Sequence, residues 1–230
     1  MTKLVLRFIA YGVIVIPLFL LVGLEGYYRI LLPKQLPAVS AEPIPTQVRD
    51  ALWLGCGAKR KHDLHPLFPF IISLFFPQNR PDELLLSRIA RIHIGRLQQE
   101  GKLPHEKNLK FQLREAAVST WISRHWTADQ AVDTYGSLVW MGSGHRGLQA
   151  AARNLFEEKL DNLSHSQVVL LMAMMRSPRS YDPACHPEQA LNARNHFLQK
   201  MKEAALLDDE ELERAISMPL GVSSACEQSK

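Results

Sequence analysis

An uncharged apolar run near the N-terminus, Phe8 to Leu24, limits what this chain can form more than any other part of its sequence. Leu4 to Leu6 extend the run across the single charge of Arg7, so it reaches the roughly 20 residues that a helix needs to cross a bilayer. A cleaved signal peptide is the alternative, because Lys3 and Arg7 form a short basic segment before the run. No small-x-small cleavage site follows directly, so the sequence favours an uncleaved transmembrane anchor over residues 1–30.

The basic residues around this run indicate its orientation. Lys3 and Arg7 precede the run, whereas Arg29 and Lys34 follow it together with Glu25. The positive-inside rule then favours a cytoplasmic N-terminus, with the rest of the chain outside the cytoplasm. The formal net charge of +4 suits a phosphate-rich membrane surface. No basic segment interleaved with aromatic residues and no nucleic-acid motif accompanies this charge, which argues against a nucleic-acid partner.

The chain after the anchor divides into a linker, a helical domain and a tail. Residues 31–48 carry four prolines and little periodicity, which predicts an extended linker that lifts the domain off the membrane. The remaining pattern is almost entirely helical, so we expect a mostly α domain over residues 49–220 and a short tail over residues 221–230. Helices are expected over residues 81–101, 106–125 and 187–205, and further helix starts at Thr127, Ser164 and Asp208.

A dense apolar stretch and the cysteines leave alternatives open. Residues 65–77, "HPLFPFIISLFFP", are too short to span a bilayer and form either part of the core or a patch that dips into lipid. The three cysteines lack metal-ligand spacing. In an oxidising compartment Cys185 and Cys226 are the most plausible disulfide pair, and three unpaired cysteines are the alternative.

Glu115 is the carboxylate that stands out on physical grounds. Its helical neighbours Phe111, Val118 and Ile122 are apolar, and the opposite stripe of the same helix is apolar as well. A carboxylate on such a central helix is paired, protonated or functional. The purely structural interpretation is an ion pair with Arg124 or with an arginine of a neighbouring helix.

The stretch "MGSGHRGLQAAARNLF", residues 141–156, is the second candidate. It lacks the Lys-Ser/Thr pair of a phosphate-binding P-loop. Gly142, Gly144 and Gly147 instead predict a tight turn that docks a helix of small residues. Arg146 and the exposed amides of the first helical turn are a possible anion contact.

From Arg114 to Met201 the chain resembles the family 51 peptidoglycan glycosyltransferases, which include the transglycosylase domain of class A penicillin-binding proteins. Glu115 with Ala116 falls at the family's R-K-x-x-E-A motif. "YGSLVWMGSGHRGLQAAARNLF" is similar to Y-L-N-x-x-Y-F-G-x-G-x-Y-G-I-x-x-A-A-x-x-Y-F, and "NLSHSQVVLLMAMMRSPRSYDP" and "HPEQALNARNHFLQKM" match two further motifs in order. The resemblance implies a lysozyme-like helical domain behind one transmembrane helix, with residues 65–77 as its membrane-facing jaw.

The resemblance also implies a set of site residues. Glu115 takes the second carboxylate position of the family, and four residues are expected to face the diphosphate of the substrate: Ser87, Arg88, Arg91 and Arg146. Other motif positions are expected to support the fold: His62, Tyr135, Gly142, Gly144, Gly147, Pro178, Tyr181 and Pro183. Neither a metal site nor a cofactor is expected, except for a divalent cation if the protein is active.

The first half of the chain departs from the family pattern. The family's general base is the Glu of E-D-x-x-F-x-x-H, and the best alignment places Gly55 there, with Cys56 at the aspartate. Glycine cannot accept a proton, and Asp63 or Glu83 could replace the base only if the backbone is rearranged there. We therefore expect a degenerate domain with weak or no polymerase activity.

Three functions follow from this pattern. The first is a domain in bacterial cell-wall biogenesis that binds lipid II or nascent glycan strands, or regulates a peptidoglycan synthase. The second is a monofunctional glycosyltransferase that polymerises lipid II with a displaced base. The third is an adaptor that uses the fold only for protein contacts. Each version predicts a single-pass protein of the bacterial inner membrane, in contact with membrane lipid, with its domain on the periplasmic side.

Overall fold

The structure is a computed structural model of the 230-residue chain. It describes residues 2–58, 63–65, 81–106, 109–142, 144–223 and 226, with side chains from Val15 onward. These residues are mostly helical, as predicted, whereas the likeness to lysozyme stays a prediction. The elements are α1 (Thr2–Leu31), α2 (Thr46–Gly55), α4 (Pro81–Gln99), α5 (Leu109–His125), α6 (Ala128–Leu138), β1 (Trp140–Gly142), β2 (His145–Arg146), α7 (Leu148–Phe156), a 3-10 turn (Leu160–Asn162), α8 (His165–Arg176), α9 (Pro187–Glu203) and α10 (Asp209–Ser217).

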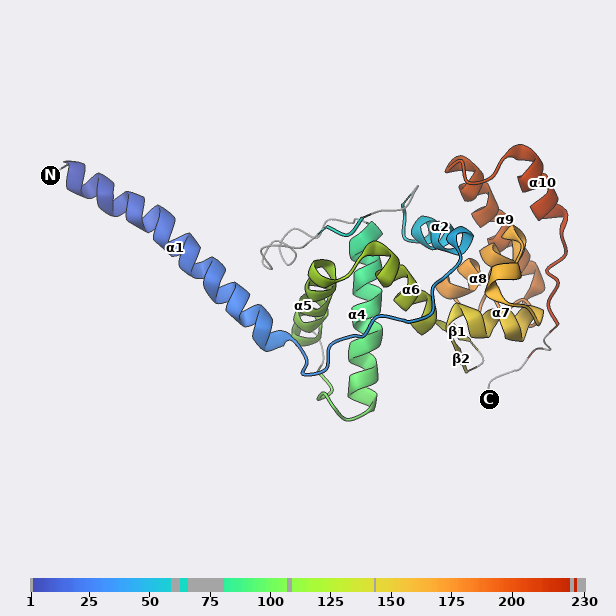
Figure 1. Cartoon of the computed structure of the whole chain (residues 1–230), viewed down its shortest axis with the longest axis horizontal. Coiled ribbons are helices and arrows are strands. Elements are labelled where there is room, and N and C mark those ends of the chain that lie inside the picture. The colour runs from blue at the N-terminus through green and yellow to red at the C-terminus, as the bar shows by residue number, and fades with distance from the viewer. Residues whose placement is uncertain are drawn as a thin grey trace.

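Figure 1 shows a helical body from which α1 projects on one side. Helices α4, α5 and α6 form the half of the body next to α1, and α7 to α10 form the other half together with α2. Helix α8 is the centre of this second half, because every side chain from Val168 to Met174 is buried. A helix that is apolar on all sides requires such a position. A small antiparallel pair, β1 and β2, leads from α6 into α7.

The segment between α1 and α2, residues 32–45, lies on the domain rather than apart from it. We name it the strap. Its irregular backbone is bonded to two helices: His93 Nε2 on α4 lies 2.9 Å from the carbonyl oxygen of Gln35, and the Ser40 amide donates to Thr134 Oγ1 on α6 at 3.0 Å. Burial lowers the pKa of His93, which favours the neutral ring that donates from Nε2. The predicted linker is therefore extended but held against the body, and α2 begins inside its predicted range.

The structure describes the backbone of the predicted anchor from residue 2 but its side chains only from Val15, and it leaves most of the predicted jaw undescribed. Among the side chains that it does describe, no helix is both long enough and apolar enough for a membrane span. The side chains of the first half of the predicted anchor precede Val15 and are outside that set. The predicted jaw, residues 65–77, is outside it as well, except for His65. Anchor and jaw both stay predictions.

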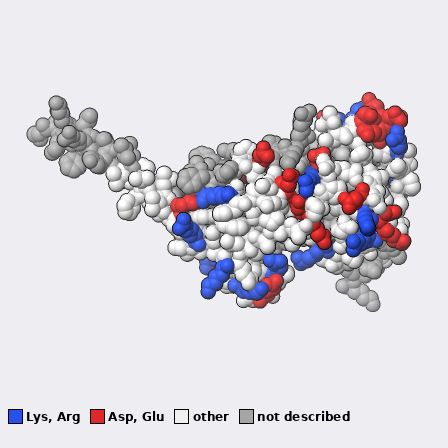
Figure 2. Space-filling view, in the orientation of Figure 1, with Lys and Arg blue, Asp and Glu red and all other residues white. Residues whose placement is uncertain are grey.

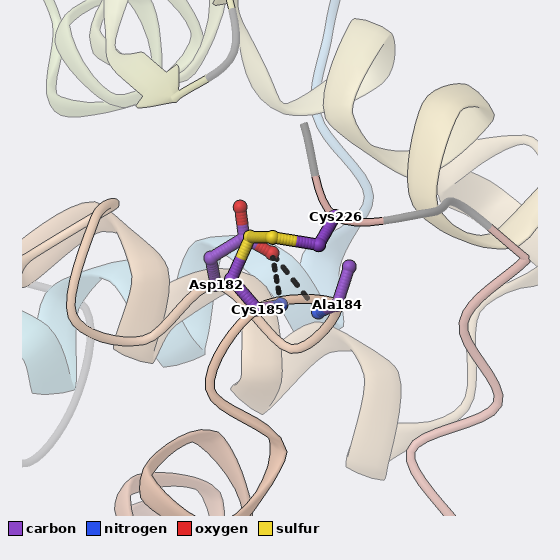
Figure 3. Close-up of a disulfide and its surroundings, with 4 residues drawn as sticks. All are labelled: Asp182, Ala184, Cys185 and Cys226. Carbon is purple, nitrogen blue, oxygen red and sulfur yellow. Dashed lines mark hydrogen bonds between the residues drawn. A yellow bond between two sulfur atoms is a disulfide. The ribbon is translucent and has the colours of Figure 1, made fainter. Parts of the chain in front are cut away.

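Helix caps and a disulfide secure the second half of the body. Capping boxes at Thr127, Ser164 and Asp208 start α6, α8 and α10, which confirms these predicted helix starts. Cys185 and Cys226 form a disulfide with their Cα atoms 4.8 Å apart, so the bridged alternative holds (Figure 3).

The turn that carries Cys185 is braced by a carboxylate. Asp182 Oδ1 accepts from the amides of Ala184 at 2.9 Å and Cys185 at 3.4 Å (Figure 3). The chain end that the disulfide holds is also bonded to α7, because the Ser223 amide donates to the Leu155 carbonyl at 2.8 Å. The C-terminal tail is thus fixed at two points.

Arg194 on α9 is fully buried and joins three helices. Its guanidinium donates to Ser166 Oγ on α8 at 3.0 Å, and to the carbonyl oxygens of Ile216 at 3.0 Å and Met218 at 2.7 Å at the end of α10. These carbonyls have no partner within their own helix end, so the arginine replaces the missing helical donors. Burial lowers the pKa of Arg194.

Candidate functional site

The structure brings three of the predicted site residues together between α4 and α5. Arg91 holds both carboxylate oxygens of Glu115, with Nη2 at 3.2 Å from Oε1 and 3.1 Å from Oε2 and Nε at 3.2 Å from Oε2. The Ser87 hydroxyl donates to Oε1 of the same carboxylate at 2.5 Å. Ser87 and Arg91 are four residues apart, so they lie one above the other on one face of α4.

This cluster lies at the edge of the core. The Glu115 side chain is 10% exposed, whereas that of Arg91 is 67% exposed. The carboxylate of Glu115 is therefore nearly buried, and its negative charge is balanced by the guanidinium of a side chain that is largely in solvent. Arg124, which the sequence offered as one partner, instead pairs with Glu25 of α1. Since Arg91 and Ser87 both engage Glu115, this carboxylate is a fixed acceptor of hydrogen bonds in the structure.

Arg88 faces a different set of groups, one helical position away. Its Nη1 lies 3.4 Å from the Tyr135 hydroxyl and 3.9 Å from Cys56 Sγ, and its Cζ lies 5.8 Å from the centre of the Tyr135 ring. Burial raises the pKa of both Tyr135 and Cys56, while the charge of Arg88 opposes that shift. Both groups are therefore neutral at physiological pH, so Arg88 keeps its positive charge uncompensated by either of them.

The glycine-rich stretch forms the predicted turn. Gly142, Gly144 and Gly147 all have positive φ angles, which other residues rarely adopt. At Gly147 a side chain is excluded by space as well, since a Cβ there would lie 2.8 Å from the Ser137 carbonyl oxygen. A Cβ at Gly142 would lie 3.3 Å from Pro178, so the turn packs against this second motif.

Arg146 lies in a separate groove. This groove of about 650 Å³ is lined by the strap, by the end of α6 and by the start of α7, with the cations Arg146, Arg153 and Lys159 along it. None of its lining residues belongs to the group around Glu115. Arg146 Cζ also lies 6.0 Å from the ring centre of the exposed Trp140. The structure therefore does not join Arg146 to Arg88 and Arg91.

The remaining candidates lie outside these clusters. Gly55 ends α2 beside Cys56, and a Cβ built there would meet only the Phe197 ring, at 3.8 Å. Asp63 is exposed and forms no hydrogen bond or ion pair within the described part of the chain. Glu83 lies on α4 one turn before Ser87. His62 is outside the described residues, and Tyr181 and Pro183 lie in the turn after α8.

Two features of the site could not be read from the sequence. In the alignment Cys56 only took the place of the family's aspartate. In the structure, Cys56 and Tyr135 both contact Arg88. Glu25 was read as part of the membrane flank, yet it pairs with Arg124 of α5. Across the residues that the structure describes, no group of three or more histidine, cysteine, aspartate or glutamate side chains is placed to hold a metal ion.

Parts of the chain are similar to known proteins. Residues 96–202 match the family model described as Transglycosylase. The chain is 30% identical over 153 residues to penicillin-binding protein 1A of Aquifex aeolicus, covering 62% of this chain and 21% of that protein. It is 27% identical over 118 residues to the provisionally named transglycosylase H16_A0665 of Cupriavidus necator, covering 51% of each chain. A crystal structure of penicillin-binding protein 1A from Haemophilus influenzae aligns with 61% of this chain and 17% of that one, at 18% identity and a TM-score of 0.39.

Proposed function

Because residues 96–202 of this chain belong to the transglycosylase family, we propose that the protein is a membrane-anchored, peptidoglycan glycosyltransferase-like protein with weak or no polymerase activity. It binds lipid II or its glycan product and acts in cell-wall biogenesis, as a binding protein or as a regulator of a synthase. The chain covers only a fifth to a half of the relatives named above, so its substrate and partner are part of this proposal.

The environment of Glu115 is the observation that carries the proposal. Glycosyl transfer to a hydroxyl needs a carboxylate that is free to take its proton. The family's position for that base is Gly55 by alignment, and Glu115 is already engaged by Arg91 and Ser87. Positioned base catalysis contributes a factor of about 10² to 10⁴, so we expect the rate to be lower by at least that much.

Arg88 supports retained binding. Within the described residues it contacts a phenol and a thiol but no carboxylate, so its charge is available to an anion. A diphosphate offers several oxygens to a guanidinium, which binds such groups well. Arg91 is a weaker candidate for this contact than its neighbour Arg88, because Glu115 already compensates its charge.

A working enzyme with a displaced base is the second candidate, and the position of Glu83 favours it. Glu83, Ser87 and Arg91 follow one another at intervals of four residues, which puts them on one stripe of α4. Asp63 is less well supported, because it is exposed and makes no contact with this stripe that the described residues record.

The surface of α1 supports the proposed anchor. The apolar side chains from Ile16 to Val22 point in all directions around the helix, yet each of the large ones is exposed: Ile16, Leu18, Phe19, Leu20, Leu21 and Val22. An apolar helix with no protein cover is stable only in an apolar surrounding. The described part of α1 also carries no charged atoms until it meets the body (Figure 2).

The test is a glycan-chain gel with labelled lipid II and the purified full chain in detergent or nanodiscs, run with and without a divalent cation. We expect no polymer, or far less than an active glycosyltransferase makes. Robust polymer overturns the proposal, and its loss in Glu83→Gln or Asp63→Asn then identifies the displaced base.

Binding is measured separately with the same labelled lipid II. We expect wild type to bind and Arg88→Ala to bind severalfold more weakly. Arg214→Ala is the matched control, because Arg214 is exposed on α10 and pairs only with Glu210 among the described residues. If wild type neither binds nor polymerises, the chain is an adaptor that uses the fold for protein contacts.

A further inference from the structure

We propose that the C-terminal end of α5 lies in the headgroup layer of the bilayer and is held there by α1. We name residues 121–126, which are the last residues of α5 and the Trp126 that follows it, the α5 tip. The inference rests on the proposed anchor and adds a second, lipid-facing surface to it. Its occupant is the membrane interface rather than another protein.

An ion pair and an aromatic contact join α1 to the α5 tip. Arg124 on α5 forms a salt bridge with Glu25 on α1, and its guanidinium carbon lies 4.8 Å from the ring centre of Tyr28. Tyr28 and Leu31 are both buried, and they pack with Ala117 of α5 in a small apolar cluster. An arginine on a tyrosine face adds a cation–π attraction to the charge pair.

A second contact lies at the other end of this interface. Arg114 Nη1 donates to the Leu31 carbonyl at 2.6 Å, where α1 ends. Glu106 holds the same guanidinium through two hydrogen bonds of 2.8 Å. Arg114 thus supplies a hydrogen-bond donor to a carbonyl at the C-terminal end of α1, where the helix itself provides none. Contacts separated by more than two helical turns of α5 fix α1 in direction as well as in position.

The order of these contacts sets the depth of the α5 tip relative to the bilayer. Glu25 meets Arg124 and Leu31 meets Arg114, so the C-terminal end of α5 lies beside Glu25, the contact on α1 that is nearer to its apolar run. Figure 1 shows α1 leaving the body at an angle to α5. The exposed apolar surface of α1 reaches Val22, three residues before Glu25. At a rise of about 1.5 Å per residue, that is only about 5 Å along the helix. When this apolar surface lies in hydrocarbon, the tip lies at the adjoining headgroups.

The composition of the tip suits that level. Trp121 stacks on His125 with 4.6 Å between ring centres, and Trp126 meets Trp121 edge-on at 6.3 Å. His125 is exposed and Trp121 is half-buried, whereas Trp126 is buried in the core, so Trp121 and His125 are the open part of this aromatic group. Tryptophan and basic side chains collect at membrane interfaces, because their apolar rings and polar groups match that layer.

The contacts between α1 and α5 would then decide which face of the domain meets the bilayer. A flexible tether would leave the domain free to rotate relative to α1. The two contacts between α1 and α5, together with the strap bonded to α4 and α6, restrict that rotation. The tip is therefore a surface that orients the domain, separate from the predicted jaw.

The experiment uses the full chain in nanodiscs, with a fluorescent label on one cysteine at a time in a Cys56→Ser background. The labelled variants are His125→Cys at the tip, Phe19→Cys on α1 and Leu191→Cys on α9, all at exposed positions. The lipids carry bromine either near the headgroup or at mid-chain, and bromine quenches only labels at its own depth. We expect mid-chain bromine to quench Phe19→Cys, headgroup bromine to quench His125→Cys severalfold more than Leu191→Cys, and Leu191→Cys to stay unquenched.

Two outcomes overturn the inference in different ways. If Phe19→Cys is quenched and His125→Cys is not, the anchor holds and the tip is not at the interface. If neither is quenched, the proposed anchor itself fails. For the contact with α1, Arg124→Glu should lower quenching at His125→Cys severalfold, and the charge swap with Glu25→Arg should restore it. Unchanged quenching in Arg124→Glu excludes the salt bridge as the orienting contact, and circular dichroism checks that each variant is folded.

Discussion

The partner of Glu115 determines what its substitution does. In Glu115→Gln the amide oxygen still accepts from Ser87, but Arg91 loses its counter-charge. Because the Arg91 side chain is 67% exposed, water compensates most of that loss. We therefore expect the free energy of unfolding to fall by about 1–3 kcal/mol, as for a hydrogen bond to a charged group, rather than by the larger cost of breaking a fully buried pair. Urea denaturation measures this value.

A double-mutant cycle separates the pair from its surroundings. Arg91→Ala should lower the free energy of unfolding by less in the Glu115→Gln background than in wild type, because the ion pair is already absent there. Ser87→Ala is the neighbouring control, since it removes the hydroxyl and leaves the ion pair in place. Fully additive effects of Arg91→Ala and Glu115→Gln would contradict the interaction that the structure shows.

The sequence predicted that Glu115 is paired, protonated or functional, but it did not identify the partner. Helical periodicity shows which side chains share a face of one helix, and this was enough to find a carboxylate in an apolar surrounding. Arg91 is 24 residues away on another helix, whereas Arg124 lies nine residues further along the same helix, on its opposite face. Only the packing of α4 on α5 shows which arginine of a neighbouring helix reaches Glu115.

At the scale of elements, the disulfide closes a loop around α9 and α10. Cys185 and Cys226 are 41 residues apart, and a loop of that size stabilises a small domain by about 2–4 kcal/mol, mainly through the unfolded state. Cys226→Ser should lower the melting temperature and make it insensitive to reductant. Cys56→Ser is the control, because Cys56 is the free cysteine, and this variant should keep the response to reductant. A wild-type melting temperature that reductant leaves unchanged would contradict the bridge.

The contact between Glu106 and Arg114 makes the start of α5 sensitive to acid. Hydrogen bonds from Arg114 lower the pKa of Glu106 from 4.5 to about 2. The folded-state pKa thus lies below the unfolded value, so the stabilisation is complete above pH 4.5 and is lost as the pH falls towards 2. Unfolding by urea across this range should show a smaller loss of stability in Glu106→Gln than in wild type. Glu203→Gln, at an exposed position, should behave as wild type does, and an identical slope in all three proteins would contradict the contact.

Helix starts were the elements that the sequence predicted best. Pro81, Thr127, Ser164, Pro187 and Asp208 all carry local signals, and all begin or cap a helix in the structure. Helix α2 was missed because it has no such signal. Its N-cap is Pro45, which makes no side-chain cap, and the segment before it is rich in proline. Its burial against α8 and α9 stabilises it instead, and such a tertiary effect has no local signature.

For the whole molecule, the largest difference from the sequence-based expectation concerns how α1 and the domain are joined. Proline content predicted a spacer, but backbone groups of the strap are bonded to side chains of α4 and α6. A proline-rich sequence predicts extended backbone, but it does not show whether that backbone is solvated or packed on the surface of the domain. The bonds to His93 and Thr134 connect residues 58 and 94 positions apart, and no local pattern reports them.

This joint leads to a prediction about truncation. A chain that begins at Glu25 keeps Tyr28, Leu31 and the salt bridge to Arg124, whereas a chain that begins at Leu32 loses all three. Two buried side chains contribute about 2–5 kcal/mol together, so the shorter chain should unfold at lower urea concentration although both lack the apolar run. Tyr28→Ala in the chain from Glu25 should reproduce part of the loss, and Tyr27→Ala, at an exposed position, should not. Equal stability of the two truncated chains would mean that α1 is only tethered to the domain, and the same result would remove the basis for a fixed α5 tip.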